Sequence, residues 1–358
     1  MRTYSGTILL GLILCVLSKP LSAQVKNQAL RGFPVVFYTE ETSFAVGGLG
    51  IFTFDFENNL DSGKPSQINF GAAYTLEKQL LLYFPYELYL QQNNWRLDGE
   101  IGYYRYTYKY YGIGSNTPES NEETYRVNFP RIQINALHKV SRNIYAGVSY
   151  WYDRYDMTNI QSGGLLDTNN PTGTAGGTHS GIGISSVFDT RDNIFYTESG
   201  SYLELQGLID QSWTGSDYDF FQLSLDARTF HTNAYDHTLG FNFVSKFTGG
   251  NVPFQKLALL GGPKQMRGYL EGRYRDKVYL TTQAEYRVPV YKRFGAVIFA
   301  SVGNVAQNLS DFPLTNLKWT LGPGLRYMID ENRKVNIRLD AGFGPGVSGF
   351  VLTIGEAF

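Results

Sequence analysis

Residues 278–290 read VYLTTQAEYRVPV, and their side chains alternate between two kinds. The even positions are mostly apolar, whereas the odd positions, which include Glu285 and Arg287, are mostly polar. Successive side chains of a β-strand point to opposite faces, so a period of two indicates a strand with one apolar and one polar face. Residues 221–228 and 334–343 show the same alternation, and we interpret them as strands of the same kind.

The composition explains why such strands favour a transmembrane barrel. The chain has 358 residues, of which 42% are hydrophobic and only 18% are charged, with 27 tyrosines and 24 phenylalanines. Its mean hydropathy is nevertheless −0.24. A membrane barrel accounts for both values, because each strand alternates a lipid-facing apolar residue with a polar or small residue that faces the lumen. A soluble antiparallel sandwich has the same alternation, so the period alone leaves that alternative open.

Composition also excludes several other classes of protein. A chain so rich in aromatic rings can bury enough surface to fold, which argues against disorder. The 31 basic residues nearly balance the 32 acidic ones, so we expect no nucleic-acid partner. Cys15 is the only cysteine and lies in the apolar start of the chain, so we expect neither disulfides nor cysteine-bound metal.

Strand number and connection lengths favour the barrel over the sandwich. We expect sixteen antiparallel strands, near 34–39, 42–55, 66–76, 79–91, 95–111, 123–139, 143–157, 178–191, 200–211, 218–232, 237–248, 278–290, 295–306, 317–329, 334–344 and 348–358. Short connections fall on the periplasmic side, at 92–94, 140–142, 233–236, 291–294 and 330–333, and most long ones fall outside, at 112–122, 158–177, 249–277 and 307–316. This asymmetry is typical of outer-membrane barrels, with the 56–65 connection as a mild exception.

The first 23 residues are interpreted as a cleaved signal peptide. Arg2 supplies a positive start, residues 8–17 form a short apolar core, and residues 21–23 end in small side chains. The apolar run is shorter than the ~20 residues that a membrane-spanning helix needs, which argues against an uncleaved anchor.

The rest of the chain is expected to comprise a short periplasmic segment, 24–33, and the transmembrane barrel, 34–358. The first strand, 34–39, is short and begins with Pro34, which has no N–H to donate to a neighbouring strand. This strand must pair with the last one to close the barrel. We therefore regard the seam between them as a place where the barrel opens, with a permanently closed seam as the alternative.

Aromatic residues crowd one end of two predicted strands. They are Tyr103, Tyr104, Tyr106, Tyr108, Tyr110 and Tyr111 on one strand, and Tyr150, Trp151, Tyr152 and Tyr155 on another. Amphipathic rings prefer the depth of the lipid headgroups, so we expect these residues to form part of an interfacial girdle.

No motif indicates catalysis. The four histidines, His138, His179, His231 and His237, lack metal-ligand spacing. Ser185 and Ser186 lack the strand-turn-helix setting of a nucleophile elbow. We therefore predict no catalytic residue, metal or cofactor, while an outer-membrane hydrolase that uses His231 remains the least favoured alternative.

Five segments together resemble the BamA/TamA-type outer-membrane barrel superfamily, also called the bacterial surface antigen family. They are FDTRDN at 188–193 with GSYL at 200–203, the stretch from Gly261 to Asp276 with MRGY at 266–269, EYRVP at 285–289, RLDAG at 338–342, and FVLTIGEAF at 350–358. Any one segment is weak evidence, but all five occur in the family's order.

The resemblance implies that the long loop near 249–277 folds back into the lumen. Its tip would be Arg267, Gly268 and Tyr269, and Arg267 would meet Glu285, whose parity places it inward. The family pattern Phe-x-Asp is replaced here by FAS at 299–301, so Ser301 carries no charge. The contact would then be weaker, unless Asp340 compensates.

Two further sets of residues come from the resemblance. The periplasmic hairpin motif comprises Asp189, Arg191, Asp192 and Gly200, and the C-terminal recognition strand comprises Phe350, Leu352, Ile354, Gly355 and Phe358. Gly355 is also a position at which the last strand could bend.

The implied function is help with insertion or passage of protein or lipid at the outer membrane of a Gram-negative bacterium. The implied partners are outer-membrane lipids, the barrel-assembly machinery that inserts this chain, and separate periplasmic proteins in place of preceding domains. A passive or gated pore is the alternative, although lumen charges of both signs argue against strong ion selectivity.

Overall fold

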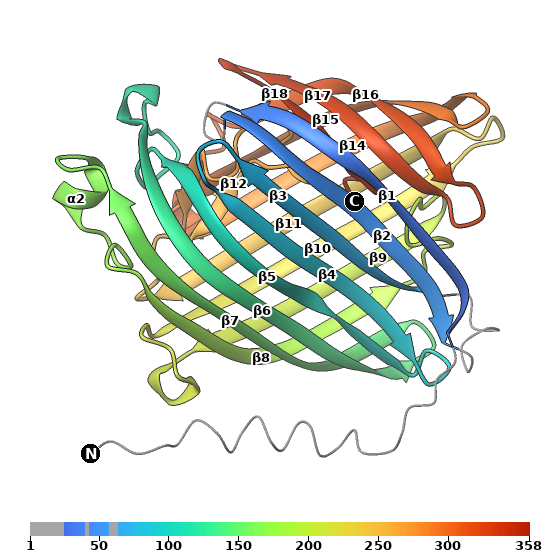
Figure 1. The fold of residues 1–358 in the computed structure, drawn as a ribbon, viewed down its shortest axis with the longest axis horizontal. Helices are drawn as coiled ribbons and strands as arrows, with labels where there is room; N and C mark the ends of the chain where they lie inside the picture. Colours follow the sequence, from blue (N-terminus) through green and yellow to red (C-terminus); the bar gives the residue numbers. More distant parts are fainter. Residues whose placement is uncertain (1–24, 40–42, 57–63) are drawn as a thin grey trace.

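The computed structural model describes residues 25–39, 43–56 and 64–358, and the structural statements below concern these residues. Sixteen strands form one antiparallel sheet that curls into a barrel. The strands follow one another around the sheet in chain order, from β1 to β11 and then from β14 to β18. In Figure 1 the strands β2 to β7 form the near wall, and β9 to β14 cross behind them. The predicted all-β fold with sixteen antiparallel strands is confirmed.

The strand bounds lie close to the predicted ones, apart from the two ends of the sheet. They are β1 (Val25–Thr39), β2 (Ser43–Phe56), β3 (Ser66–Thr75), β4 (Leu80–Leu90), β5 (Trp95–Tyr110), β6 (Glu123–Ser141), β7 (Ile144–Ile160), β8 (Gly177–Asp189), β9 (Gly200–Asp210), β10 (Phe220–Thr232), β11 (Thr238–Gly250), β14 (Val278–Tyr291), β15 (Phe294–Ala306), β16 (Lys318–Asp330), β17 (Val335–Gly344) and β18 (Val347–Ile354).

Short elements occupy the outer connections. They are η2 (Glu119–Asn121), α2 (Leu165–Asn169), η3 (Ser212–Thr214), η4 (Leu309–Asp311) and a separate hairpin of β12 (Ala258–Leu260) and β13 (Tyr274–Asp276). None of the helices among the described residues is long and apolar enough to cross a membrane.

The first strand is longer than predicted. It starts at Val25 rather than at Pro34, so the expected separate segment 24–33 is, from Val25 onward, part of β1. The reason is that β2 pairs with β1 from Val25 to Thr39, with one irregularity between Lys26 and Ala29. Pro34 is tolerated because β1 is an edge strand, where a missing N–H can face the unpaired side.

The two ends of the sheet are not joined. β1 and β18 are its edges, and no ladder connects them in the described residues, so the expected pairing of first and last strands is wrong for this structure. β18 also stops at Ile354, four residues before the predicted end at Phe358, because the chain turns at Gly355, whose φ is 87°. A positive φ suits glycine and ends the extended strand.

The predicted alternation holds along the walls. Outward side chains such as Phe221 and Leu205 are 49% and 47% exposed, whereas the inward side chains Gln283, Glu285 and Arg287 are buried. The apolar set therefore lies on the outside of the sheet and the polar set inside it, as in membrane barrels.

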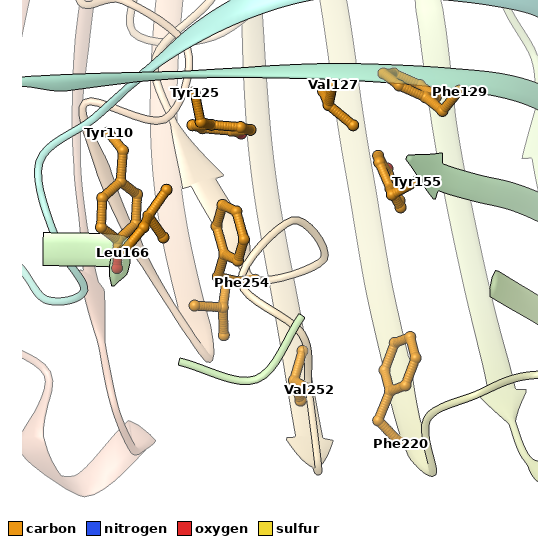
Figure 2. Packing of buried hydrophobic residues seen from close by; sticks show 10 residues of the cluster. Tyr110, Tyr125, Val127, Phe129, Tyr155, Leu166, Phe220, Val252 and Phe254 are labelled. Carbon is orange, nitrogen blue, oxygen red and sulfur yellow. The ribbon is translucent and has the colours of Figure 1, made fainter. Parts of the chain in front are cut away.

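The expected aromatic girdle is only half correct. Tyr103 and Tyr150 are exposed on the outside, but Tyr104, Tyr106, Tyr108 and Tyr110 of β5 share the opposite parity and face inward. Tyr110, Tyr125, Phe129, Tyr155, Phe220 and Phe254 form a buried cluster with Val127, Leu166, Val252 and Leu257 in the outer half of the lumen (Figure 2). Tyr104 and Tyr108 pack against it. Consecutive residues of a strand cannot share a face, so a run of tyrosines had to divide between lipid and lumen.

Candidate functional site

The long connection between β11 and β14, residues 251–277, is here called the inner loop. Its hairpin β12–β13 leads to a tip whose side chains are buried inside the barrel. Leu260, Met266 and Tyr269 pack with Tyr279 of β14 and Val305 of β15. The inner loop is therefore held against the lumen wall by apolar contacts, on one side of its arginine.

Arg267, at the tip of the inner loop, is fully buried between three strands. Its Nη1 lies 2.6 Å from Glu285 Oε1 on β14 and 2.7 Å from Asp340 Oδ2 on β17. Its guanidinium carbon lies 3.6 Å from the centroid of the Phe299 ring on β15. A buried guanidinium is stable only when paired, and these two carboxylates and one ring face supply that pairing.

The same two carboxylates bind three more arginines. Asp340 accepts hydrogen bonds from Arg326 Nη1 at 2.5 Å and from Arg338 Nη1 at 2.6 Å. Glu285 accepts one from Arg287 Nε at 2.9 Å. The parity of the strands predicts that these three arginines face the lumen, but it does not predict that they converge on Arg267. We call Arg267, Arg287, Arg326 and Arg338, with Glu285, Asp340 and Glu356, the arginine cluster.

Gly268 lets the loop backbone touch the wall. Its φ is 110°, and a Cβ at this position would lie 2.9 Å from the backbone of Gly342 on β17. The approach is reciprocal, since a Cβ on Gly342 would lie 2.2 Å from the carbonyl oxygen of Arg267. Glycine at both positions is what allows Arg267 to reach Asp340.

Ser301 does not join the cluster. Its Oγ lies 3.4 Å from Gln283 Oε1, while Gln283 Nε2 donates to the carbonyl oxygen of Lys264 in the inner loop at 2.8 Å. The charge absent at Ser301 is provided by Asp340. Gln283 was not recognised from the sequence, because an amide in a lumen-facing position carries no signal of a loop contact.

A second segment closes the periplasmic mouth. Residues 190–199, here called the mouth loop, join β8 to β9, and their Ile194 and Phe195 pack with Ile51 of β2 and Val335 of β17. Asn193 Nδ2 donates to the carbonyl oxygen of Arg333 at 3.3 Å. Strands β2 and β17 are far from β8 in the sheet, so the mouth loop crosses the opening.

The predicted hairpin motif fixes the start of the mouth loop. Arg191 donates to both oxygens of Asp189, at 2.9 and 3.1 Å, and Lys64 donates to Asp189 at 2.9 Å. Burial is the largest single effect on Arg191 and lowers its pKa, but the hydrogen bonds to Asp189 and the negative charge of that carboxylate together outweigh it, so the pKa of Arg191 lies above its ordinary value. Asp192 Oδ1 accepts three backbone N–H groups of the loop, and Gly200 ends the loop with a φ of 100°.

The predicted C-terminal strand divides into two parts. Phe350 and Leu352 are exposed on the outside of β18, whereas residues 355–358, here called the terminal segment, leave the sheet and enter the lumen. Phe358 is buried against Phe230, and its carbonyl oxygen accepts a hydrogen bond from Arg287. Phe358 is thus not part of a lipid-facing strand.

Glu356 connects the terminal segment to the arginine cluster. Its Oε2 lies 2.7 Å from Arg326 Nε, and its Oε1 accepts from Asn336 at 2.9 Å. Because Arg326 also binds Asp340, one arginine joins the end of β18 to the tip of the inner loop. A sequence pattern for an extended strand gives no hint of this contact.

Ser185 and His179, two of the residues considered for catalysis, each contact other side chains. Ser185 Oγ lies 2.6 Å from Ser149 Oγ and accepts a hydrogen bond from Gln206. His179 is buried among Tyr155, Tyr218 and Phe220. In the part of the chain that the structure describes, no group of three or more His, Cys, Asp and Glu residues could hold a metal ion.

A sixteen-stranded sheet with an outer loop anchored inside it by an arginine defines a class of outer-membrane β-barrel. The sequence matches the Omp85 superfamily domain over residues 59–358, and the chain belongs to this superfamily. Barrels of this superfamily are bacterial outer-membrane proteins.

Two solved structures illustrate the likeness in fold. BamA from Haemophilus ducreyi lacking POTRA domains 1–3 has a TM-score of 0.58 at 14% identity, covering 91% of this chain and 70% of that one. CdiB from Acinetobacter baumannii has a TM-score of 0.51 at 12% identity, covering 91% of this chain and 65% of that one. A comparison with curated proteins finds no match.

Replacing Asp340 by Asn tests the arginine cluster. The substitution leaves three buried arginines short of a charged partner, and we expect it to lower the free energy of unfolding by about 3–5 kcal/mol. Protease added outside intact vesicles should then cut the inner loop faster. Asp311→Asn, at an exposed position in η4, is the control and should leave both measurements unchanged.

Replacing Gly268 by Ala tests the close approach of the loop and β17. Gly346→Ala is the matched control, because Gly346 also has a positive φ but no atom lies within 4 Å of an added Cβ. Both variants carry the strain of alanine at positive φ, about 1–2 kcal/mol. Only Gly268→Ala should also expose the inner loop to protease, and equal protection of the two variants would contradict the packing described.

Proposed function

We propose that this chain assists the insertion or passage of polypeptide at the outer membrane, using the free edges of β1 and β18 as its working surface. The observation that carries the proposal is that the edge strands β1 and β18 are not paired with each other, while side chains fill the lumen at its outer and periplasmic ends. Membership of the Omp85 superfamily is consistent with this role.

A filled lumen argues against free passage through the middle of the barrel. The inner loop and the aromatic cluster of Figure 2 occupy the outer half, while the mouth loop and the terminal segment occupy the periplasmic end. Each of these segments is fixed by buried ion pairs or ring contacts. A polypeptide would therefore meet less resistance along the edges of the sheet than through its centre.

The edges themselves suit the pairing of an added strand. An unpaired edge presents a row of backbone N–H and C=O groups that can bind another strand. β1 offers 15 residues and β18 offers eight. Leu30 on β1 and Phe350 and Leu352 on β18 are strongly exposed, as lipid-facing side chains beside a seam would be.

A polar cavity of about 540 Å³ lies beside β1 at the periplasmic end. Its lining includes Asn27, Arg31, Arg191, Asp330 and Arg333, which come from β1, the mouth loop, β16 and the turn that follows β16. The lining contains positively charged, negatively charged and neutral hydrogen-bonding side chains, which suit contact with a polar peptide. We infer that separate periplasmic proteins deliver the polypeptide to this side of the barrel.

Crosslinking the seam tests the proposal. Cysteines at Leu30 and Leu352, joined by a short bifunctional reagent, should hold the edges together. We expect vesicles that carry the wild type to speed the insertion of an unfolded eight-stranded barrel protein, and the crosslinked variant to lose this effect until the crosslink is cleaved.

The control places cysteines at Leu205 and Leu225, which face each other across the paired strands β9 and β10. Crosslinking there should leave the rate of insertion unchanged. A wild type that gives no acceleration, or a seam crosslink that preserves it, would count against the proposed function.

Measuring the ion conductance of the protein in planar bilayers distinguishes the proposed function from a passive pore. Because the lumen is occupied, planar-bilayer recordings of the wild type should give small flickering currents. Replacing residues 258–276 by a flexible linker should increase them several-fold, whereas deleting residues 309–311 of η4 should not. A large and steady wild-type conductance would favour a pore.

A further inference from the structure

Strands β5, β6 and β7 extend further at the outer end than their neighbours, and their outward side chains change in chemistry there. Along β5, the outward residues Trp95, Ile101 and Tyr103 are exposed and apolar or amphipathic. The next outward residue is Arg105, about 7 Å further along the strand. Exposed tyrosines of membrane barrels lie at the boundary between the apolar core of the membrane and the lipid headgroups. Arg105 lies beyond Tyr103 on the outer side, so we place it at the depth of the headgroups.

A second arginine lies beside Arg105 on the same face. The register pairs Arg105 with Asn128, and Thr107 with Arg126. Arg105 and Arg126 are therefore diagonal neighbours, about 7–8 Å apart on the outer surface. Arg126 Nε donates to Thr107 Oγ1 at 3.3 Å, which holds its guanidinium along the strands. Neither arginine forms an ion pair with a carboxylate among the described residues, in contrast to the buried arginines of the lumen.

The surrounding charges leave this region positive. Arg154 and Asp156 lie on the outward face of β7, and Glu77 and Lys78 lie in the turn between β3 and β4. Lys109, further out on β5, is paired with Glu122 at 3.0 Å. With the Lys109 pair set aside, the described charged residues named here are four cations, Arg105, Arg126, Arg154 and Lys78, and two carboxylates, Asp156 and Glu77.

A different pair of side chains lies at the outer end of the opposite wall. There the outward residues Ile209 of β9 and Phe221 of β10 lie opposite each other and are exposed and apolar. The outward pair Arg105 and Arg126 thus differs in chemistry from the outward pair at the outer ends of β9 and β10.

We propose that Arg105 and Arg126 bind a phosphate group of a lipid headgroup in the outer leaflet. A guanidinium donates two parallel hydrogen bonds to phosphate oxygens, and two guanidinium groups side by side can hold one phosphate between them. Basic clusters next to the apolar part of a membrane protein bind anionic lipid headgroups in this way. The site lies outside the barrel and is independent of the seam.

The test uses the full chain in phosphatidylcholine nanodiscs and measures the binding of bisphosphorylated lipid A, with lipid A lacking phosphate as the comparison. The double variant Arg105→Gln with Arg126→Gln should bind the bisphosphorylated lipid at least about tenfold more weakly. The double variant Arg142→Gln with Lys292→Gln removes the same charge from exposed periplasmic turns and should bind like the wild type. An unchanged circular dichroism spectrum shows that each variant is folded.

Equal binding by the wild type and the Arg105/Arg126 variant would overturn the site. Equal binding of lipid A with and without phosphate would overturn its chemistry. Binding of inorganic phosphate at millimolar concentration without binding of the lipid would identify free phosphate as the ligand and refute a lipid site. None of these outcomes depends on whether the protein inserts polypeptides, so the two proposals can fail separately.

Discussion

A buried guanidinium at the tip of the inner loop is the constraint on which the interior of this barrel depends. Arg267 has no access to water, so its charge must be met by protein groups. Glu285 and Asp340 meet it from β14 and β17, and the ring of Phe299 covers its face. Because each carboxylate also serves other arginines, the position of the loop and the arrangement of three strands depend on one another.

Much of the fold follows from a period of two. Parity alone placed Glu285, Arg287 and Asp340 inside, and their burial agrees with that placement. The same alternation places Tyr103 of β5 on the outer face and the tyrosines at even positions on the inner face. Expecting all of them at the membrane interface was an error, because Tyr104, Tyr108 and Tyr110 lie in or against the lumen cluster.

The ends of the chain were harder to predict, for physical reasons. A glycine within an alternating pattern reads as a strand residue, yet Gly355 takes a positive φ and turns the chain inward. At the other end, Pro34 reads as a strand start, although the pairing with β2 begins at Val25. The mouth loop could be located from its motif, but its reach across the opening depends on the packing of Phe195 against strands distant in sequence.

The two bonds of Arg326 have a consequence for communication within the molecule. Its Nη1 binds Asp340, which holds the loop, and its Nε binds Glu356, which holds the end of β18. The two contacts use different nitrogen atoms of one side chain, so they are coupled through the position of Arg326, and such coupling is reciprocal. Displacement of the terminal segment is therefore expected to change the stability of the contact between Asp340 and the inner loop, and displacement of the loop is expected to change the stability of the terminal segment by the same factor.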